Sequence, residues 1–340
     1  MRVEPPIDSL RESAAKDAFE RARLLVAEDL ERVNHLVVTR LESTVPLIGE
    51  LARHLVAAGG KRIRPLLTLL SARLCGYAGD RHIALATCVE FIHTATLLHD
   101  DVVDGSDLRR GRASANAIWG NKAPVLVGDF LFSRAFQLMV ADGSLRVLEI
   151  LARASAVIAE GEVAQLRTTG DLGTDEARYL AVVEAKTAAL FEAACRVGAA
   201  VAGRGRAEEE ALATYGRHLG IAFQLVDDAL DYAADPARLG KGVGDDFREG
   251  KITLPVILAL ARADAEERAF WKRTLEDLDQ GPDDLARALA ILARHDAVAA
   301  TLERARAFGE RARAALAVFP AGPHREALSG LVDFCIARAY

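Results

Sequence analysis

The sequence predicts an all-α fold, and three observations support this prediction. Ala, Leu, Arg and Glu dominate the chain, and the alternation of β-branched residues that is typical of strands is almost absent. Several long segments carry apolar residues at the i, i+3, i+4 and i+7 spacing of an amphipathic helix. Gly and Pro fall between these segments, at residues 59–60, 76–80, 105–111, 170–174, 203–205, 235–244 and 281–282.

The stretches between these breaks have the length of helices, so we expect about ten or more helices. Segment 82–104 is nearly free of charge until its end, which is typical of a central helix surrounded by others. No internal repeat and no linker-like change of composition divides the chain. We therefore expect a single domain over residues 1–340, in which residues 1–25 form a peripheral N-terminal helix.

The bulk composition narrows the possible functions. Hydrophobic residues make up 51% of the chain and can build a core, while the net charge of −6 argues against a nucleic-acid partner. The four cysteines are scattered without a CxxC pair, so we expect reduced thiols rather than disulfides or a zinc site. The start of the chain lacks the apolar stretch of a signal peptide, and no charge-free run is long enough to span a membrane. These features predict a cytoplasmic protein.

Two apolar helical segments end in clustered aspartates. The first cluster is Asp100, Asp101 and Asp104, and the second is Asp227, Asp228 and Asp231. In each cluster the first and last aspartates are four residues apart, so on a helix they share one face. Carboxylates at a helix C-terminus oppose the helix dipole and repel one another, and Mg²⁺ would remove both conflicts. A solvated acidic helix end is the alternative for one cluster, but two copies favour metal binding. An EF-hand does not fit, because the residues after the first cluster lack oxygen ligands at alternate positions.

Two basic clusters accompany the aspartates. Gly59 and Gly60 precede Lys61, Arg62 and Arg64, at a point where a following proline suits the first turn of a helix. Cations at a helix N-terminus repel the positive end of the dipole, and a bound phosphate would reconcile the two. A solvated basic turn is the alternative. The second cluster, Arg109 and Arg110, follows the first aspartates closely, as expected if metal ions and guanidinium groups hold one diphosphate from two sides.

The remaining candidates are single polar residues. Lys186 and Thr187 interrupt the apolar helical stretch Glu176–Val201, where a lysine could also simply extend to solvent. Lys241 and Lys251 flank a Gly-rich segment after the second aspartate cluster, which is a weak signal by itself. His93 and His99 lack the spacing of a zinc motif, so a buried structural histidine is the default interpretation.

With these residues in place, the sequence resembles the trans-isoprenyl diphosphate synthases from about residue 45 to the C-terminus. The likeness is greatest to the bacterial members that make octaprenyl diphosphate. The motifs that carry it are GGKRIRP, EFIHTATLLHDDVVDGSDLRRGRASAN, VLVGDFLFSRAF, EGEVAQL, KTAALFEAA, GIAFQLVDDALDY and GKGVGDDFREGKITLP. The resemblance implies long antiparallel helices around a deep central cavity, usually in a homodimer.

The resemblance also implies roles for individual residues. About three Mg²⁺ ions would be bound by Asp100, Asp101, Asp104, Asp227, Asp228 and Asp231. Isopentenyl diphosphate would be bound by Lys61, Arg64, His93 and Arg110. The allylic diphosphate would be bound by Arg109, Lys186, Thr187, Gln224, Lys241 and Lys251. Of these residues, Arg109, Lys186, Thr187 and Gln224 would act in catalysis.

Product length is a separate question. Short-chain members of the family carry a bulky residue four or five positions before the first aspartate cluster, where this sequence has Ala95 and Thr96. Small residues there leave room for a growing chain, which predicts a long product of C40 to C50. Met139 and Leu151 are large apolar candidates for the floor of the tunnel, and ordinary core packing is their alternative.

The sequence therefore predicts a Mg²⁺-dependent long-chain trans-polyprenyl diphosphate synthase. It would condense isopentenyl diphosphate head-to-tail onto an allylic diphosphate, with farnesyl diphosphate the expected primer. The product would partition into membranes and serve as a quinone side chain. A class I terpene cyclase is one rival, although it would not need the GGKRIRP site. A non-catalytic subunit of a heteromeric synthase is another, although such a subunit would be expected to have lost aspartates.

Overall fold

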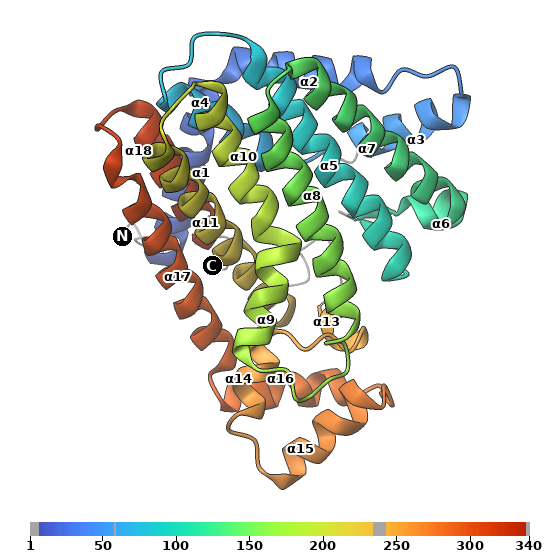
Figure 1. The fold of residues 1–340 in the computed structure, drawn as a ribbon. Coiled ribbons are helices and arrows are strands. Elements are labelled where there is room, and N and C mark those ends of the chain that lie inside the picture. Colours follow the sequence, from blue (N-terminus) through green and yellow to red (C-terminus); the bar gives the residue numbers. More distant parts are fainter. Residues whose placement is uncertain (1–6, 58, 110, 234–242, 338–340) are drawn as a thin grey trace, which may run out of the picture.

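The computed structural model describes residues 7–57, 59–109, 111–233 and 243–337 of the chain. Long helices run side by side along the molecule, and a group of short helices covers one end of them (Figure 1). Two pairs of residues form minimal strands, and nearly all other regular structure in the described ranges is helical. The prediction of an all-α fold is therefore confirmed.

The helices of the first two thirds of the chain form the body of the bundle. They are α1 (Ile7–Leu25), α2 (Ala27–Arg40), α3 (Pro46–Ala57), α4 (Ile63–Leu74), α5 (Arg81–Val103), α6 (Ala115–Trp119), α7 (Lys122–Asp142), α8 (Leu145–Leu166), α9 (Glu176–Val183), α10 (Ala189–Val201) and α11 (Arg206–Ala233). The chain continues with α13 (Asp245–Arg248), α14 (Leu254–Leu260), α15 (Ala265–Trp271), α16 (Asp284–Arg294), α17 (Ala297–Ala315) and α18 (Pro323–Ala337). Shorter elements are the π-helices η1 (Glu184–Ala188) and η2 (Lys272–Glu276), the 3₁₀-helix η3 (Leu316–Val318), and the strands β1 (Leu108–Arg109) and β2 (Arg112–Ala113).

The breaks predicted at 59–60, 76–80, 105–111, 170–174, 203–205 and 281–282 lie between helices of the structure, whereas others, such as those at Val26 and Asp296, carry neither Gly nor Pro. The segment expected at 82–104 is α5, and the stretch expected at Glu176–Val201 is filled without a gap by α9, η1 and α10. The break at 105–111 contains a feature that was not predicted, because β1 and β2 pair antiparallel there. Gly111 has a φ of 73° in this turn, a conformation that favours glycine. Strands of two residues have no periodicity, so the sequence pattern could not reveal them.

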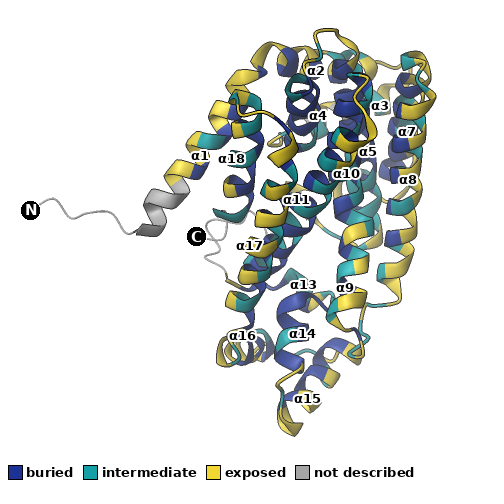
Figure 2. Ribbon diagram, turned by 60° about the vertical axis from the view of Figure 1, so that its left-hand side comes forward, coloured by how far each residue is buried: buried dark blue, intermediate teal, exposed yellow. Residues whose placement is uncertain are grey.

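Buried apolar side chains form two clusters (Figure 2). The larger one fills the body of the bundle around α4, α5 and α10. The smaller one lies at the end covered by the short helices and includes α14 and the fully buried Trp271. α5 is buried over most of its length before the aspartates, as its lack of charge predicts. The four cysteines are buried and free.

Among the described helices, α7 alone is long and apolar enough to cross a membrane by length and composition. Of that stretch, 44% is buried inside the protein. The helix packs along α5 in the bundle. Because a core helix passes the same test of length and composition, α7 is weak evidence for a membrane span.

α10 and α11 approach each other closely at glycines of α11. A Cβ atom added to Gly216 would lie 2.4 Å from the backbone oxygen of Phe191, and one added to Gly220 would lie 2.7 Å from the Cα atom of Ala188. These neighbours are backbone atoms, which cannot rotate away as the end of a flexible side chain can. The glycines therefore set the distance between α11, which carries the second aspartate cluster, and the continuous stretch of η1 and α10, which carries Thr187.

We predict that Gly216→Ala destabilises the protein by about 1–3 kcal/mol despite the better helix propensity of alanine, because the helices must move apart. Thermal or denaturant unfolding measures this loss. Gly205→Ala is the matched control, since nothing lies within 4 Å of a Cβ atom there and the backbone is not left-handed. Equal stability of the two variants would contradict the prediction.

Candidate active site

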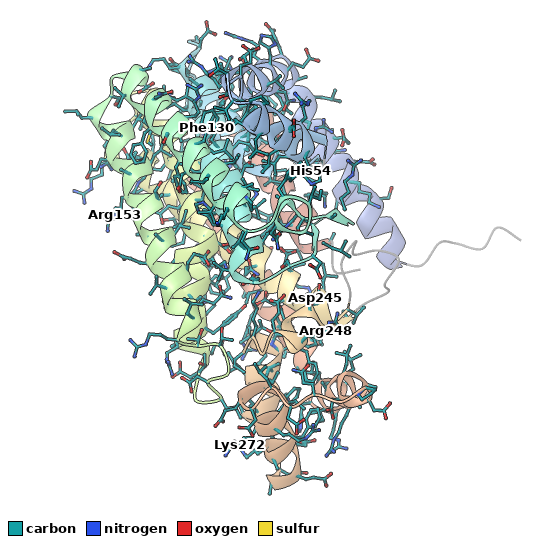
Figure 3. The ribbon with its side chains drawn as sticks, turned by 90° about the vertical axis from the view of Figure 1, so that its right-hand side faces the viewer. His54, Phe130, Arg153, Asp245, Arg248 and Lys272 are labelled. Carbon is teal, nitrogen blue, oxygen red and sulfur yellow. The ribbon has the colours of Figure 1, made fainter. Side chains whose placement is uncertain are left out.

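A cavity of about 1060 Å³ lies between the two apolar clusters and is lined by residues from distant parts of the chain. α5, α11 and α13 supply its aspartates, while the start of α4 and the turn before it, η1 and the segment after α13 supply cations. Figure 3 shows Asp245 and Arg248 of α13 between the long helices and the end group that holds Lys272. The predicted site residues that line the cavity are Lys61, Arg64, His93, Thr96, Asp100, Asp104, Arg109, Lys186, Thr187, Gln224, Asp227, Asp228, Asp231 and Lys251.

The side chains of the first aspartate cluster point in two directions. Asp100 and Asp104 line the cavity, whereas the carboxylate of Asp101 is buried and accepts a hydrogen bond from Nε of Arg109 at 2.8 Å. Successive residues of a helix point in directions about 100° apart, which turns Asp101 away from its neighbours. In this structure Asp101 holds Arg109 of β1 against the end of α5, and its role as a metal ligand stays a prediction.

Burial raises the pKa of Asp100 to about 7; Lys186 opposes this shift, and the carboxylates of Glu162 and Asp104 add to it. The Nζ atom of Lys186 is 3.8 Å from the carboxylate of Asp100. The Nζ atom of Lys251 is 2.9 Å from that of Asp104. Each cavity-facing aspartate of α5 thus has one lysine beside it.

The second aspartate cluster is part of a hydrogen-bonded chain. Thr187 donates to Oε1 of Gln224 at 2.9 Å, and Nε2 of Gln224 donates to Asp228 at 2.7 Å. The hydroxyl of the buried Tyr179 donates to the other oxygen of Asp228. Burial still raises the pKa of Asp228 to about 6, with Asp227 and Asp231 adding repulsion. These hydrogen bonds fix the side chains of Gln224 and Thr187, which were predicted to lie beside the allylic substrate.

Asp231 receives backbone hydrogen bonds from the N-terminus of α13. The amides of Asp245 and Asp246 donate to its two carboxylate oxygens at 3.2 and 3.0 Å. This contact brings the Asp246 side chain into the cavity, where removal from bulk water and the charges of Asp228 and Asp231 raise its pKa well above its usual range. Burial lowers the pKa of Lys251, but the carboxylates of Asp104, Asp246 and Glu249 outweigh that effect and raise it.

Lys186 and Thr187 lie on the π-helix η1, where the wider turn interrupts α9 and α10. Such single π-turns are frequent at functional sites. α8 approaches this turn closely, since a Cβ atom added to Gly161 would lie 2.8 Å from the Cβ atom of Ala185. The contact places Glu162 and Gln165 of α8 within 2.7 Å of the Lys186 ammonium.

The basic turn before α4 presents two of its three cations to the cavity. Lys61 and Arg64 line it, and Nη1 of Arg64 lies 3.1 Å from Nε2 of His93. Arg62 instead forms an ion pair with the buried Glu90 of α5. Its φ of 51° is unusual for a residue other than glycine, and the ion pair stabilises this left-handed turn.

The other predicted site residues have different positions. Arg110 and Lys241 lie outside the described residues. Ala95, Met139 and Leu151 are fully or almost fully buried in the larger core cluster and do not belong to the cavity lining, whereas Thr96 does. Their roles in product length remain predictions.

Several lining residues were missed by the sequence analysis. Glu162 and Gln165 lie in the EGEVAQL motif and Asp246 lies in the GKGVGDDFREGK motif, so a signal was present but no role was assigned. Tyr179, Lys16 and Phe334 lie in no motif. Lys16 belongs to the N-terminal helix that was predicted to be peripheral. α1 buries an apolar stripe that includes Phe19 along α18, and this packing brings Lys16 to the cavity wall.

The donor set suits a hard dication. Among the residues that the structure describes, no group of three acidic, histidine or cysteine side chains forms a ready-made metal site. Mg²⁺ commonly takes one or two carboxylates and completes its shell with substrate phosphate and water. Burial, and to a lesser extent neighbouring carboxylates, raise the pKa values of Asp100 and Asp228, so their ionised forms lack full compensation within the protein. A dication bound with a diphosphate would balance their negative charge.

Comparisons with known proteins agree with this arrangement. The chain matches the polyprenyl synthetase family over residues 45–292. It is 48% identical to the octaprenyl diphosphate synthase of Escherichia coli (strain K12) over 320 residues, which cover 94% of this chain and 99% of that protein. Its fold is similar to the polyprenyl synthase of Caulobacter crescentus CB15, solved with calcium and isoprenyl diphosphate, with a TM-score of 0.92, 53% identity, and coverage of 95% of this chain and 98% of that chain. A decaprenyl diphosphate synthase from Rhodobacter capsulatus gives a TM-score of 0.91 at 53% identity, with 95% and 99% covered.

Together with these matches, the helical bundle whose aspartates and cations line one cavity identifies a prenyltransferase, an enzyme that acts on isoprenyl diphosphates. The chain belongs to the polyprenyl synthetase family.

We predict that the contribution of Asp100 to the free energy of unfolding of the metal-free protein falls as pH rises from about 4 to 7. Its pKa is higher in the folded than in the unfolded chain, so the folded state binds more protons in this range and its advantage falls as they leave. Mg²⁺ binds the ionised form, so it should raise the melting temperature more at pH 8 than at pH 6.

Thermal unfolding in EDTA or in Mg²⁺ at both pH values measures this effect. Asp100→Asn should flatten the pH dependence and reduce the Mg²⁺ effect, and Asp17→Asn on the exposed side of α1 is the control. An unchanged Mg²⁺ response in Asp100→Asn would contradict the prediction.

Proposed function

We propose that this protein is a Mg²⁺-dependent long-chain trans-polyprenyl diphosphate synthase. It adds isopentenyl diphosphate head-to-tail to an allylic diphosphate, with farnesyl diphosphate as primer, to give a product of C40 to C50. The observation that carries the proposal is the division of one cavity into an acidic side on α5 and α11 and a basic side before α4. Such a cavity would accommodate two diphosphates, each bound by a different set of groups.

The acidic side would hold the allylic diphosphate together with its metal ions. Asp100 and Asp104 of α5 and Asp227, Asp228 and Asp231 of α11 would be the ligands. Bound Mg²⁺ would neutralise the charge that develops on the departing diphosphate. Lys186 and Lys251 already lie beside these carboxylates and would donate to the same phosphate oxygens, and Arg109 lies at the same rim.

The basic side would hold isopentenyl diphosphate through Lys61, Arg64 and His93, with Arg110 as a further predicted contact. Its double bond would then attack C1 of the allylic group, and a proton would leave for the departed diphosphate. Thr187 and Gln224 form a hydrogen-bonded pair at the cavity wall, where their dipoles would face the allylic carbons. The apolar side chains of Leu97 and Phe223 at the wall would exclude water from the cation.

The length of the product is supported by relatives that carry long-chain names. The relative from Escherichia coli is an octaprenyl synthase and the one from Rhodobacter capsulatus is a decaprenyl synthase. Chains of that length partition into membranes, and we propose that this product becomes a quinone side chain. The enzyme itself is proposed to be cytoplasmic.

The proposed homodimer is supported by exposed apolar side chains on α7 and α8. Leu126, Phe136 and Val140 of α7 and Val163 and Leu166 of α8 are at least 44% exposed. Apolar residues gathered on neighbouring helices often mark an interface. A second copy of the chain, packed against these helices, would cover them and leave the cavity open.

The experiment that tests the proposal uses pure protein, labelled isopentenyl diphosphate, farnesyl diphosphate and Mg²⁺, followed by chromatography of the dephosphorylated products. We expect one long prenyl alcohol. Asp100→Ala and Asp227→Ala should each lower kcat by about 100-fold or more, as losses of charge stabilisation at a reacting group do. Asp277→Ala, at an exposed carboxylate, is the control. A cyclic hydrocarbon would instead identify a terpene cyclase, and an inactive wild type would favour a non-catalytic subunit.

The cavity-lining Thr96 gives a test of product length. It lies one helical turn before Asp100 on α5, about 6 Å along the axis, so a bulky side chain there should block the growing chain below the diphosphates. We expect Thr96→Phe to give mainly C15 or C20 alcohols while turnover of the first addition is kept. Thr96→Val, of nearly equal size, should leave the wild-type length.

Ala95, Met139 and Leu151 are tested in the same assay. Met139→Ala or Leu151→Ala should lengthen the product if these residues close the tunnel, and should only cost about 2–5 kcal/mol of stability if they are core. An unchanged product from both Thr96→Phe and Ala95→Phe would contradict a tunnel along this part of α5.

A further inference from the structure

The wall of the cavity next to Lys61 is built by two helices that lie outside the residues matched to the family. α1 and α18 fall before and after residues 45–292, and they pack along each other in the bundle (Figures 1 and 2). Phe334 of α18 is 6% exposed and lines the cavity together with Lys61. This wall therefore belongs to the substrate site, although no motif predicts it.

The Lys61 ammonium lies over the ring of Phe334, with Nζ 4.7 Å from the ring centroid. That distance is within the range of a cation–π interaction. Behind the ring, Phe19 of α1 stacks on Phe334 with centroids 4.2 Å apart and planes 18° from parallel. The Phe19 ring is also 6% exposed. Two packed rings from two helices thus form one rigid support for a lysine on a glycine-rich turn.

The kind of support matters for the chemistry. Arg62, the third cation of this cluster, pairs with Glu90 and does not line the cavity. The face of an aromatic ring attracts a cation through its quadrupole and adds no negative charge that phosphate must displace. Arg64 is held in the same way, with its guanidinium carbon 4.5 Å from the ring centroid of Phe191. The two cations of the turn that line the cavity both rest on rings.

We propose that Phe334, backed by Phe19, is a positioning residue that orients Lys61 for the diphosphate of the homoallylic substrate. This inference rests on the proposed function, which assigns Lys61 to isopentenyl diphosphate. The C-terminal and N-terminal helices then contribute to the affinity for one substrate and not for the other. Lys251 and Lys186, which serve the allylic side, lie against carboxylates and are independent of this wall.

Steady-state kinetics of Phe334→Leu test the proposal. The loss of the ring should raise KM for isopentenyl diphosphate about three- to tenfold, with kcat and KM for the allylic diphosphate nearly unchanged. Phe334→Tyr keeps the ring and should keep the wild-type KM. Phe19→Leu should act on the same substrate in the same direction, but more weakly. In a Lys61→Ala background, Phe334→Leu should raise this KM no further, because the group that it positions is gone.

A purely structural role is separated by a matched control. Phe319→Leu removes a ring of similar burial that does not line the cavity, so it should lower the melting temperature without a change of KM for either substrate. Should Phe334→Leu fail to fold, Phe334→Met and Phe19→Leu carry the same test. The proposal is overturned if the Phe334 variants leave this KM unchanged, or if their effects add fully to that of Lys61→Ala. If wild type does not condense the substrates, or Lys61→Ala has no effect on this KM, the proposed function fails first.

Discussion

Aspartates from α5, α11 and α13 share one cavity, and the rest of the site depends on how their negative charge is balanced. Burial raises the pKa values of Asp100, Asp228 and Asp246, which means that the ionised forms pay for their removal from water. Single lysines, such as Lys251 beside Asp104, and the hydrogen-bond donors to Asp228 stabilise the ionised carboxylates. These contacts offset the charge only in part. A cavity whose carboxylates gather on α5, α11 and α13 is suited to a ligand that brings dications with it.

The scaffold keeps these groups close through small residues at the helix contacts. Gly216 and Gly220 let α11 approach α10, and Gly161 lets α8 approach η1. The π-turn of η1 then directs Lys186 toward α8 and α5 while Thr187 reaches Gln224 on α11. Two neighbouring side chains thus reach different helices. This arrangement depends on the close approach of the helix backbones at these glycines.

Much of this arrangement could be predicted from the sequence, because it is encoded in local spacing. Several helix boundaries followed from Gly and Pro, and the i, i+4 spacing of the aspartates followed from helix geometry. The hydrogen bond from Arg109 to Asp101 was not predicted, although the angle between successive residues of a helix indicates that Asp101 points away from Asp100. The entry of Asp246 depends on amides that cap Asp231, and the contribution of α1 depends on its packing against α18. Contacts of that kind join residues far apart in the chain, and a single sequence gives no local signal for them.

The charges also explain why the two proposed substrate sites differ. On the acidic side, a diphosphate without metal would meet the carboxylates of Asp100 and Asp104 at close range and be repelled. On the basic side, Lys61, Arg64 and His93 offer hydrogen-bond donors, and aromatic rings lie against Lys61 and Arg64. In the proposed arrangement, a diphosphate would bind there without metal. The asymmetry would then fix the direction of the reaction, since the diphosphate bound with the dications is the one whose departure they would assist. The other diphosphate would be held by cations and would stay attached to the carbon chain.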